Sequence, residues 1–370
     1  MNWDEIKENY PAACNQVYLN TAACGLISKK TAQAQRDHFQ QFLNKGGNAY
    51  MEWISMVQDT REKAAHLINV STEDLLFVHN YTAAMNQVAA MWKDKFKDIL
   101  LLKGDYPSVI LPWEVNAYHC HYFEADNNDV ISLEVLEDKL KRIKPSILAI
   151  SHVQFSSGFK IDIRAVSDLC KKYGTYLLLD ATQSFGAYAI DIPAQGIDVF
   201  VSSVYKWTTA GFGLGICYIN PELFEDSHPY LAGNNAVGQA IMSQSDSDIT
   251  KKKAAFETGH TNFPAMCALN TALTELSEIG IDKIGARIDE LVDYLLSSLS
   301  DFISNAPIFF FPKENRSGIF SLDVKEEFVS RLIEQDIISS YRNKGLRVSV
   351  HFYNDHQDIK TFSSALKKLL

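Results

Sequence analysis

The sequence predicts an α/β fold in which a mostly parallel central sheet carries helices on both faces. Short runs of four to six apolar residues alternate with segments of helical periodicity, which is typical of strands buried on both faces. The chain has 370 residues, enough for one large domain and a smaller one. Apolar residues make up 46% and charged residues 22%, the balance of an ordinary globular protein.

The first 260 residues contain most of the predicted strands. Apolar runs with flanking helical patterns indicate an alternation of strand and helix, which favours a parallel sheet. The predicted strands are 75–78, 99–102, 147–150, 176–179, 198–202 and 215–219, and the predicted helices are 83–92 and 164–173.

After about residue 260 the pattern changes to an α+β arrangement. The expected elements are helices over 264–279 and 281–299, a strand over 319–322, a helix over 326–335, a strand over 346–352 and a helix over 355–370. We therefore predict a large domain over 16–262 and a small domain over 263–370 that also includes 1–15. The polar segment 233–253 is expected to be a mobile loop.

Charge and cysteine content exclude several classes of protein. The net charge of −10 argues against a protein that binds nucleic-acid backbones, and no apolar run reaches the length of a membrane span. The N-terminus lacks the pattern of a signal peptide. None of the cysteines forms a C-x-x-C motif, so we expect a reduced, cytoplasmic protein. The cysteines are Cys14, Cys24, Cys120, Cys170, Cys217 and Cys267.

An aspartate and a lysine stand at the ends of two successive predicted strands. Asp180 follows the strand 176–179, and Lys206 lies just beyond the strand 198–202. The carboxyl ends of parallel strands are where such sheets bind ligands. A carboxylate that holds a pyridinium proton and a lysine that forms a Schiff base are the two groups that pyridoxal phosphate needs. Taken singly, the aspartate also fits a helix cap and the lysine a surface charge.

Six short motifs occur along nearly the whole chain. They are Tyr18–Ala23, Asn80–Asn86, Asp180-x-x-Gln183, Ser203-x-Tyr205-Lys206, Phe256–Asn262 and Arg347–Asn354. In this order they resemble the motifs of the class V aminotransferase and cysteine desulfurase family of fold-type I pyridoxal-phosphate enzymes, with features of its kynureninase-like and C–S lyase-like members. The resemblance implies pyridoxal 5'-phosphate as cofactor and an amino acid or amine as substrate.

The resemblance places the cofactor phosphate at the start of the helix predicted from residue 83. Thr82 and Ala83 would meet the phosphate with unpaired backbone N–H groups, although an ordinary threonine cap is the alternative. Ser203 and Tyr205 would donate hydroxyl groups to the same phosphate.

The resemblance also assigns the residues around the cofactor ring. Lys206 would carry the cofactor and move the substrate proton, which requires a lowered amine pKa. Asp180 would keep the ring nitrogen protonated, and Gln183 would donate to the phenolic oxygen. Tyr106 would stack on the ring, with a buried core tyrosine as the alternative.

Three residues are expected to contact the substrate. Arg347 would bind the substrate carboxylate with its planar guanidinium, unless it is a surface arginine on a strand. Ala23 lies in the motif that resembles the substrate-side loop. Gln154 is expected to replace the asparagine that desulfurases carry at the position of Phe155.

The predicted function is conversion of an amino acid through an external aldimine and quinonoid, by transamination or by β-elimination of the C–S lyase type. Epimerisation remains open. Desulfurases carry a nucleophilic cysteine shortly before the arginine, but 337–346 has none, so we predict no transfer of persulfide to a partner protein. One alternative is a cysteine desulfurase or selenocysteine lyase-like activity with a relocated thiol, Cys24 or Cys120. Another is a non-catalytic binding protein, against which Lys206 and Asp180 argue.

The resemblance further implies a homodimer with shared active sites. The segment Gly259–Asn262 would cross to the neighbouring subunit, where His260 or Thr261 would reach the phosphate. No metal is expected, because His119 and His121 have no further ligand cluster after them.

Overall fold

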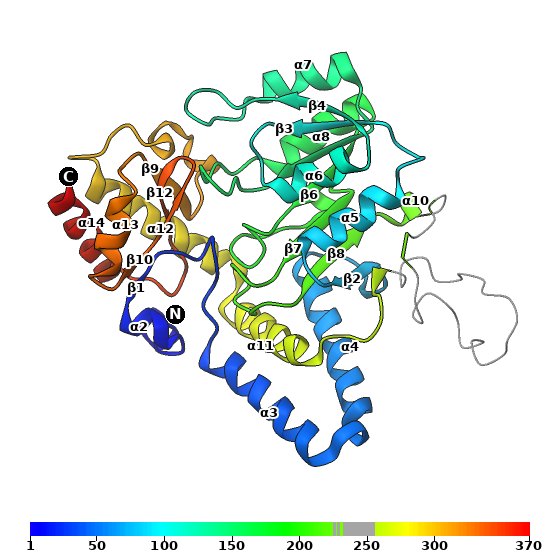
Figure 1. Cartoon of the computed structure of the whole chain (residues 1–370), viewed down its shortest axis with the longest axis horizontal. Coiled ribbons are helices and arrows are strands. Elements are labelled where there is room, and N and C mark those ends of the chain that lie inside the picture. Colours follow the sequence, from blue (N-terminus) through cyan, green and yellow to red (C-terminus); the bar gives the residue numbers. More distant parts are fainter. Residues whose placement is uncertain (225–226, 228–229, 232–255) are drawn as a thin grey trace, which may run out of the picture.

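The chain folds into a larger body around one sheet and a smaller body that contains both termini (Figure 1). The computed structural model describes residues 1–224, 227, 230–231 and 256–370. The segment 233–253, expected to be a mobile loop, lies outside the described residues. Whether the two bodies separate as domains at residue 262 stays a prediction.

The larger body is built on a seven-stranded sheet with the strand order β2-β8-β7-β6-β5-β3-β4. Six of these strands run in the same direction and only β8 runs opposite to them, so the predicted mostly parallel sheet is confirmed. The strands are β2 (Leu75–Val78), β3 (Asp98–Leu102), β4 (His119–Phe123), β5 (Ile147–Ser151), β6 (Tyr176–Asp180), β7 (Val199–Ser203) and β8 (Gly215–Ile219).

Both faces of this sheet are covered by helices, as the uninterrupted apolar runs predict. Alternate residues of β3 enter different clusters: Ile99 and Leu101 pack with α5 and α6, whereas Leu100 and Leu102 share a cluster with α7 and α8. The helices of this body are α5 (Tyr81–Met91), α6 (Pro107–Val115), α7 (Leu133–Ile143), α8 (Ile163–Tyr173), α9 (Ile192–Gln195) and α10 (Pro221–Phe224).

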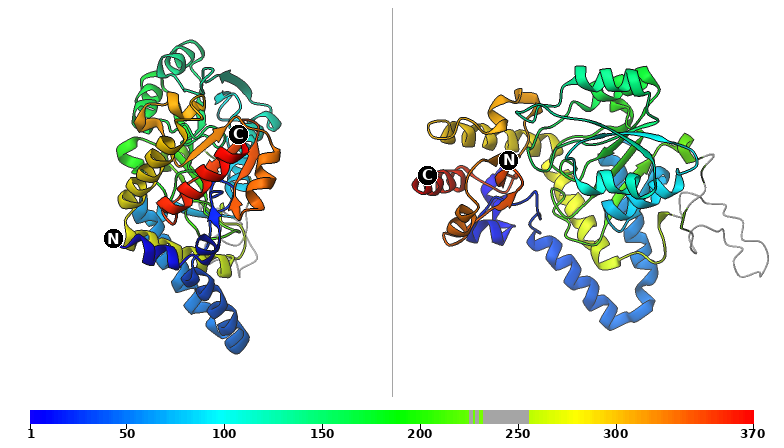
Figure 2. Two further views of the ribbon diagram at one scale, coloured as in Figure 1. Left: turned by 90° about the vertical axis from the view of Figure 1, so that its left-hand side faces the viewer. Right: turned by 45° about the horizontal axis from the view of Figure 1, so that its top comes forward.

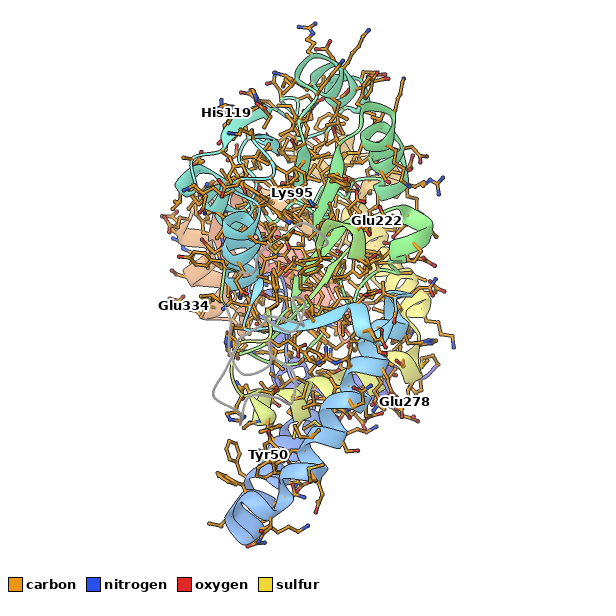
Figure 3. The ribbon with its side chains drawn as sticks, turned by 90° about the vertical axis from the view of Figure 1, so that its right-hand side faces the viewer. Tyr50, Lys95, His119, Glu222, Glu278 and Glu334 are labelled. Atoms are coloured by element: carbon orange, nitrogen blue, oxygen red, sulfur yellow. The ribbon has the colours of Figure 1, made fainter. Side chains whose placement is uncertain are left out.

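Two long helices that the sequence analysis did not identify project from the larger body. These are α3 (Lys29–Lys45) and α4 (Tyr50–Leu67), and the views in Figure 2 show them extending away from the sheet, with α11 (Phe263–Ile279) at their base. Figure 3 places Tyr50 near the far end of this pair, opposite His119. Large apolar side chains are exposed along the pair: Phe39, Phe42, Leu43, Tyr50, Met51 and Ile54. We call them the apolar tip.

The smaller body contains a three-stranded antiparallel sheet with the order β11-β12-β9. The N-terminal strand β1 pairs with β10, which ties the beginning of the chain to its end. The elements are β9 (Ile319–Leu322), β10 (Ile337–Ile338), β11 (Ser340–Arg342), β12 (Gly345–Ser349), β1 (Val17–Tyr18), α1 (Trp3–Glu8), α2 (Pro11–Asn15), α12 (Ile281–Leu299), α13 (Glu327–Ile333) and α14 (His356–Leu369).

The strand expected over 346–352 ends earlier than the sequence suggests. β12 stops at Ser349, because a turn closes between His351 and Asn354. The backbone N–H of His351 donates to Oδ1 of Asn354, and the backbone N–H of Asn354 donates to the carbonyl oxygen of His351. No helix in the described part of the chain is both long enough and apolar enough to cross a membrane.

Candidate active site

A cavity of about 670 Å³ lies at the carboxyl ends of β5, β6 and β7. This is the edge of a parallel sheet at which ligands bind. The cavity brings together eight of the predicted site residues from distant parts of the chain. These are Thr82, Ala83, Tyr106, Asp180, Gln183, Ser203, Tyr205 and Lys206.

Lys206 lies in this cavity with its side chain almost fully buried. The residue is 6% exposed, and its Nζ makes no hydrogen bond or ion pair with any described residue. Nζ lies 5.5 Å from the ring centre of Tyr106 and 5.4 Å from that of Tyr205. Burial lowers the pKa of Lys206, and this effect outweighs the opposing charge of Asp180. The site therefore gives Lys206 a larger share of the neutral amine near pH 7 than a lysine in water has, and the neutral amine is the nucleophilic form.

Asp180 ends β6 as a buried carboxylate. Its Oδ1 accepts a hydrogen bond of 2.8 Å from the backbone N–H of Thr182, which fixes the side chain at the cavity wall. Burial raises the pKa of Asp180, and the neighbouring carboxylate of Asp105 raises it further. A bound cation would relieve this unfavourable burial of negative charge, so the position suits a protonated ring nitrogen.

Two pairs of aromatic rings line the cavity. Tyr205 stacks on Phe212 with 4.6 Å between ring centres, and Tyr106 meets Phe155 edge to face at 5.4 Å. Tyr106 lines the cavity and is therefore not a buried core tyrosine. Sequence analysis missed Phe212, because a single exposed phenylalanine after a strand carries no recognisable pattern.

The start of α5 differs in one respect from the prediction. The backbone N–H of Ala83 is not unpaired, because it donates to Oδ1 of Asn80 at 2.8 Å. Asn80, not Thr82, is thus the cap of this helix, and an asparagine before a helical pattern is a recognisable capping signal. Thr82 shares a hydrogen bond of 2.8 Å with Ser108 through their hydroxyl groups.

Ser203 lies next to the start of this helix. Its Oγ accepts a hydrogen bond of 2.9 Å from the backbone N–H of Tyr81, so its hydroxyl proton is left to donate elsewhere. Together with Thr82 it provides hydroxyl groups at a helix N-terminus, where the helix dipole favours an anion.

Gln183 is held in one orientation by two hydrogen bonds. Its Oε1 accepts from the indole N–H of Trp207 at 2.7 Å, and its Nε2 donates to the carbonyl oxygen of Ala22 at 3.0 Å. An amide nitrogen carries two protons, so one remains to donate into the cavity.

Arg347 does not line the cavity but acts on it electrostatically. It is 3% exposed, its Nη1 donates to the carbonyl oxygen of Phe155 at 2.9 Å, and its Nε has no hydrogen-bond partner in the part of the chain that the structure describes. Burial lowers the pKa of Arg347 to about 10, and its charge helps to lower the pKa of Lys206. A buried guanidinium with an unpaired N–H near the cavity suits a carboxylate ligand.

Neither Ala23 nor Gln154 lines the cavity. The loop of Ala23 runs alongside Lys206, because the backbone N–H of Gly25 donates to the carbonyl oxygen of Tyr205 at 3.0 Å. The amide of Gln154, in contrast, donates to Oδ2 of Asp105 at 3.3 Å. Its predicted contact with a substrate is therefore not visible in this arrangement.

His260 and Thr261 line a separate cavity of about 30 Å³ beside the main one. The two cavities share His79 and Leu214, so this segment lies near the rim of the main cavity. Neither His260 nor Thr261 lines the main cavity of its own chain.

A tight hairpin occupies the place where the resemblance predicts a thiol-bearing loop. β11 and β12 pair up to Arg342 and Gly345, so Asn343 and Lys344 alone form the turn. Of the two cysteines considered for a relocated thiol, Cys24 interacts electrostatically with Lys206. Cys120 lies near the amino end of the edge strand β4, away from the carboxyl ends that hold the cavity, and burial raises its pKa to about 11.

These residues fit pyridoxal 5'-phosphate. Lys206 supplies a buried amine that no described side chain pairs with, and Asp180 supplies a buried carboxylate for the ring nitrogen. Aromatic rings line the same cavity, and hydroxyl groups at the start of α5 suit a phosphate. The fold and this cavity define the class of protein, a pyridoxal-phosphate-dependent enzyme.

The chain belongs to the family described as "Aminotransferase class-V", whose pattern matches residues 17–362. It is 23% identical to a probable cysteine desulfurase of Pyrococcus abyssi, over 99% of this chain and 97% of that protein. Its fold is similar to the apo structure of a cysteine desulfurase from Thermococcus onnurineus, with a TM-score of 0.89, 20% identity and coverage of 99% and 97%. A cystine C–S lyase in complex with cysteine persulfide gives a TM-score of 0.87, 18% identity and coverage of 96% and 98%.

Proposed function

We propose that this chain cleaves the carbon–sulfur bond of a cysteine-type amino acid with the help of pyridoxal phosphate. The observation that carries the proposal is the Lys206 amine, which is buried in the same cavity as Asp180 and has no hydrogen-bond or ion-pair partner among the described residues. Similarity to enzymes named cysteine desulfurase and cystine C–S lyase supports a sulfur-containing substrate over a transamination substrate.

Four residues of the cavity then have definite tasks. Pyridoxal phosphate, when bound, draws electrons away from the α-carbon of an attached amino acid. Lys206 takes the proton from that carbon and returns it, which a neutral amine can do because burial lowers its pKa. Asp180 accepts the ring N–H, and the hydroxyl groups of Thr82 and Ser203 hold the phosphate.

Arg347 is proposed to orient the substrate. Its Nη1 is fixed by the carbonyl oxygen of Phe155, and this bond orients the Nε edge, to which no described residue is hydrogen-bonded. A carboxylate bound to this edge would hold the substrate near Lys206, on which the charge of Arg347 already acts.

Cys24 is the thiol that we propose to accept the sulfur. The adjacent Gly25 lies against Tyr205 and Lys206, and the charge of Lys206 lowers the pKa of Cys24, although burial raises it more strongly. Attack by the Cys24 thiolate on the substrate sulfur breaks the Cβ–S bond. The electron pair stays with the carbon, which takes up a proton, so cysteine leaves as alanine and Cys24 becomes a persulfide. An external thiol then attacks the persulfide, which releases sulfide and leaves a mixed disulfide on Cys24. A second external thiol restores the Cys24 thiol, and the two external thiols leave joined as a disulfide.

The hairpin turn at Asn343 and Lys344 favours a second candidate, β-elimination without any protein thiol. In that reaction the substrate loses its sulfur as sulfide, and the remaining fragment hydrolyses to pyruvate and ammonia. The two candidates therefore differ in their carbon product, alanine against pyruvate.

The test is a product analysis of the cofactor-loaded enzyme with cysteine, cystine and selenocysteine as substrates. We expect release of sulfur or selenium from at least one of them, with alanine as the carbon product. The variant Lys206→Ala is the control and should release none. A keto acid that still carries its sulfur, formed only when a second keto acid is present, would instead identify a transaminase.

We propose further that the enzyme is a homodimer. The apolar tip leaves several large side chains in contact with water, and such a patch marks an interaction surface. Tyr50 of the tip contacts His260, with 6.4 Å between ring centres, so the tip adjoins the segment expected to cross to the neighbouring subunit. A second copy docked there would place its own cavity close to His260 and Thr261 of the first chain.

A further inference from the structure

Asp105 is a buried carboxylate that the roles assigned so far leave unused. It is 4% exposed and lies in the loop after β3, next to Tyr106. It forms no ion pair with any described residue, and its hydrogen bonds within the described part of the chain come from neutral groups. A buried charge without a cation is costly, so its retention calls for a physical reason.

The hydrogen bonds of Asp105 join two loops of the cavity wall. Its Oδ1 accepts from Oγ of Ser151 at 2.6 Å and from the backbone N–H of Tyr106 at 2.7 Å. Its Oδ2 accepts from the backbone N–H of Ser151 at 2.9 Å and from Nε2 of Gln154 at 3.3 Å. Both Tyr106 and Ser151 line the cavity, so Asp105 holds them from behind.

Ser151 connects Asp105 to Asp180. Ser151 and Asp180 are register partners at the ends of β5 and β6. The backbone N–H of His152, the residue after Ser151, donates to the carbonyl oxygen of Asp180 at 2.9 Å. Asp105 follows β3, and β5 with Ser151 lies between β3 and β6, so Asp105 and Asp180 lie on either side of Ser151 at the same edge of the sheet. The charge of Asp105 acts on Asp180, whose proton affinity it increases.

We propose that Asp105 is a positioning residue that holds Tyr106 and Ser151 at the cavity and places a second negative charge behind Asp180. The inference rests on the proposed cofactor, whose protonated ring nitrogen is the cation that both carboxylates would stabilise. Neutral hydrogen bonds would suffice to clamp two loops, whereas the negative charge favours a cation beside Asp180.

The test compares Asp105→Asn and Ser151→Ala with the wild type, each loaded with pyridoxal phosphate. Asp98→Asn is the matched control, because Asp98 begins the same strand at the opposite end and its side chain is 40% exposed. The measurements are the dissociation constant of the cofactor, the pH midpoint of its visible absorbance, and the melting temperature without cofactor.

Loss of the Asp105 charge should weaken cofactor binding about tenfold. It should also move the absorbance midpoint to lower pH by roughly one unit, because the protonated, cationic form of the bound cofactor would lose a stabilising negative charge. Ser151→Ala keeps both charges and should change binding in the same direction, but less. Asp98→Asn should match the wild type.

Three outcomes decide the matter. Wild-type binding and midpoint in Asp105→Asn, with only a lower melting temperature, would overturn the proposal and leave a purely structural clamp. If Asp105→Asn cannot be purified, Ser151→Ala decides, and wild-type binding in that variant overturns the proposal as well. Failure of the wild type to bind pyridoxal phosphate would instead overturn the proposed function itself.

Discussion

The backbone of Gly25 lies directly against that of Lys206. A Cβ atom at position 25 would overlap the carbonyl oxygen of Lys206, and the backbone N–H of Gly25 donates to Tyr205. The substrate-side loop and the cofactor lysine are therefore placed by one backbone contact between segments about 180 residues apart. This contact yields the first prediction.

Gly25→Ala should destabilise the protein and displace Lys206. The overlap is with backbone, which cannot rotate away, so we expect a loss of about 2 kcal/mol in the free energy of unfolding and weaker cofactor binding. Denaturant titration and cofactor titration measure the two effects. Gly47→Ala is the control, because nothing lies within 4 Å of a Cβ added there. Equal stability of the two variants would contradict the contact.

Lys206→Ala should abolish covalent attachment of the cofactor. Borohydride treatment followed by mass spectrometry should find a reduced pyridoxyl adduct on Lys206 of the wild type and none on the variant. Activity should fall by about 10³-fold or more, since both attachment and proton transfer are lost. The exposed Lys103→Ala is a suitable control. An adduct at another lysine of the variant would show that Lys206 is not the attachment site.

Much of this arrangement follows from sequence pattern, because it depends on local signals. Apolar runs locate the strands, and the family motifs locate Lys206 and Asp180. The pair α3 and α4 escaped notice because α3 is rich in charged and amide side chains, so its weak apolar stripe predicts no buried face. Asp105 escaped notice because an aspartate in a loop before a proline is typical of a turn, and only the folded sheet brings Ser151 to it.

The pH dependence of the rate should report the charges around Lys206. The positive charge of Arg342 lowers the pKa of Lys206, and the neutral amine is the active form, so the rate should rise as pH rises through this pKa. Arg342→Gln removes the charge, and the rising limb should move to higher pH by roughly 0.5 unit. Lys344→Gln, on the adjacent turn, is the matched control. A shift to lower pH in Arg342→Gln would contradict this assignment.

Cys24→Ser should separate the two sulfur routes. If Cys24 accepts the sulfur, alanine formation from cysteine should fall at least tenfold, because a hydroxyl cannot replace the thiolate. Mass spectrometry should find persulfide on Cys24 of the wild type alone. The exposed Cys14→Ser should behave as the wild type. Unchanged sulfide release from Cys24→Ser, with pyruvate as product, would establish β-elimination.

The apolar tip should hold the proposed dimer together. Leu43 is 79% exposed and Phe42 is 53% exposed, and burying them against a second copy would remove a large apolar area from water. Phe42→Asp combined with Leu43→Asp should therefore shift the mass measured by light scattering from dimer to monomer at micromolar concentration. Val115→Asp alters an equally exposed apolar residue on α6 and should leave the mass unchanged.

Dissociation should also weaken cofactor binding, because His260 and Thr261 would no longer reach the neighbouring phosphate. His260→Ala and Thr261→Ala, each measured in the intact dimer, identify which of the two residues makes that contact. A wild type that is monomeric, loaded with cofactor and active would contradict both the dimer and the shared site. A monomeric tip variant with unaltered cofactor affinity would contradict the shared site alone, since its cavity would then be complete within one chain.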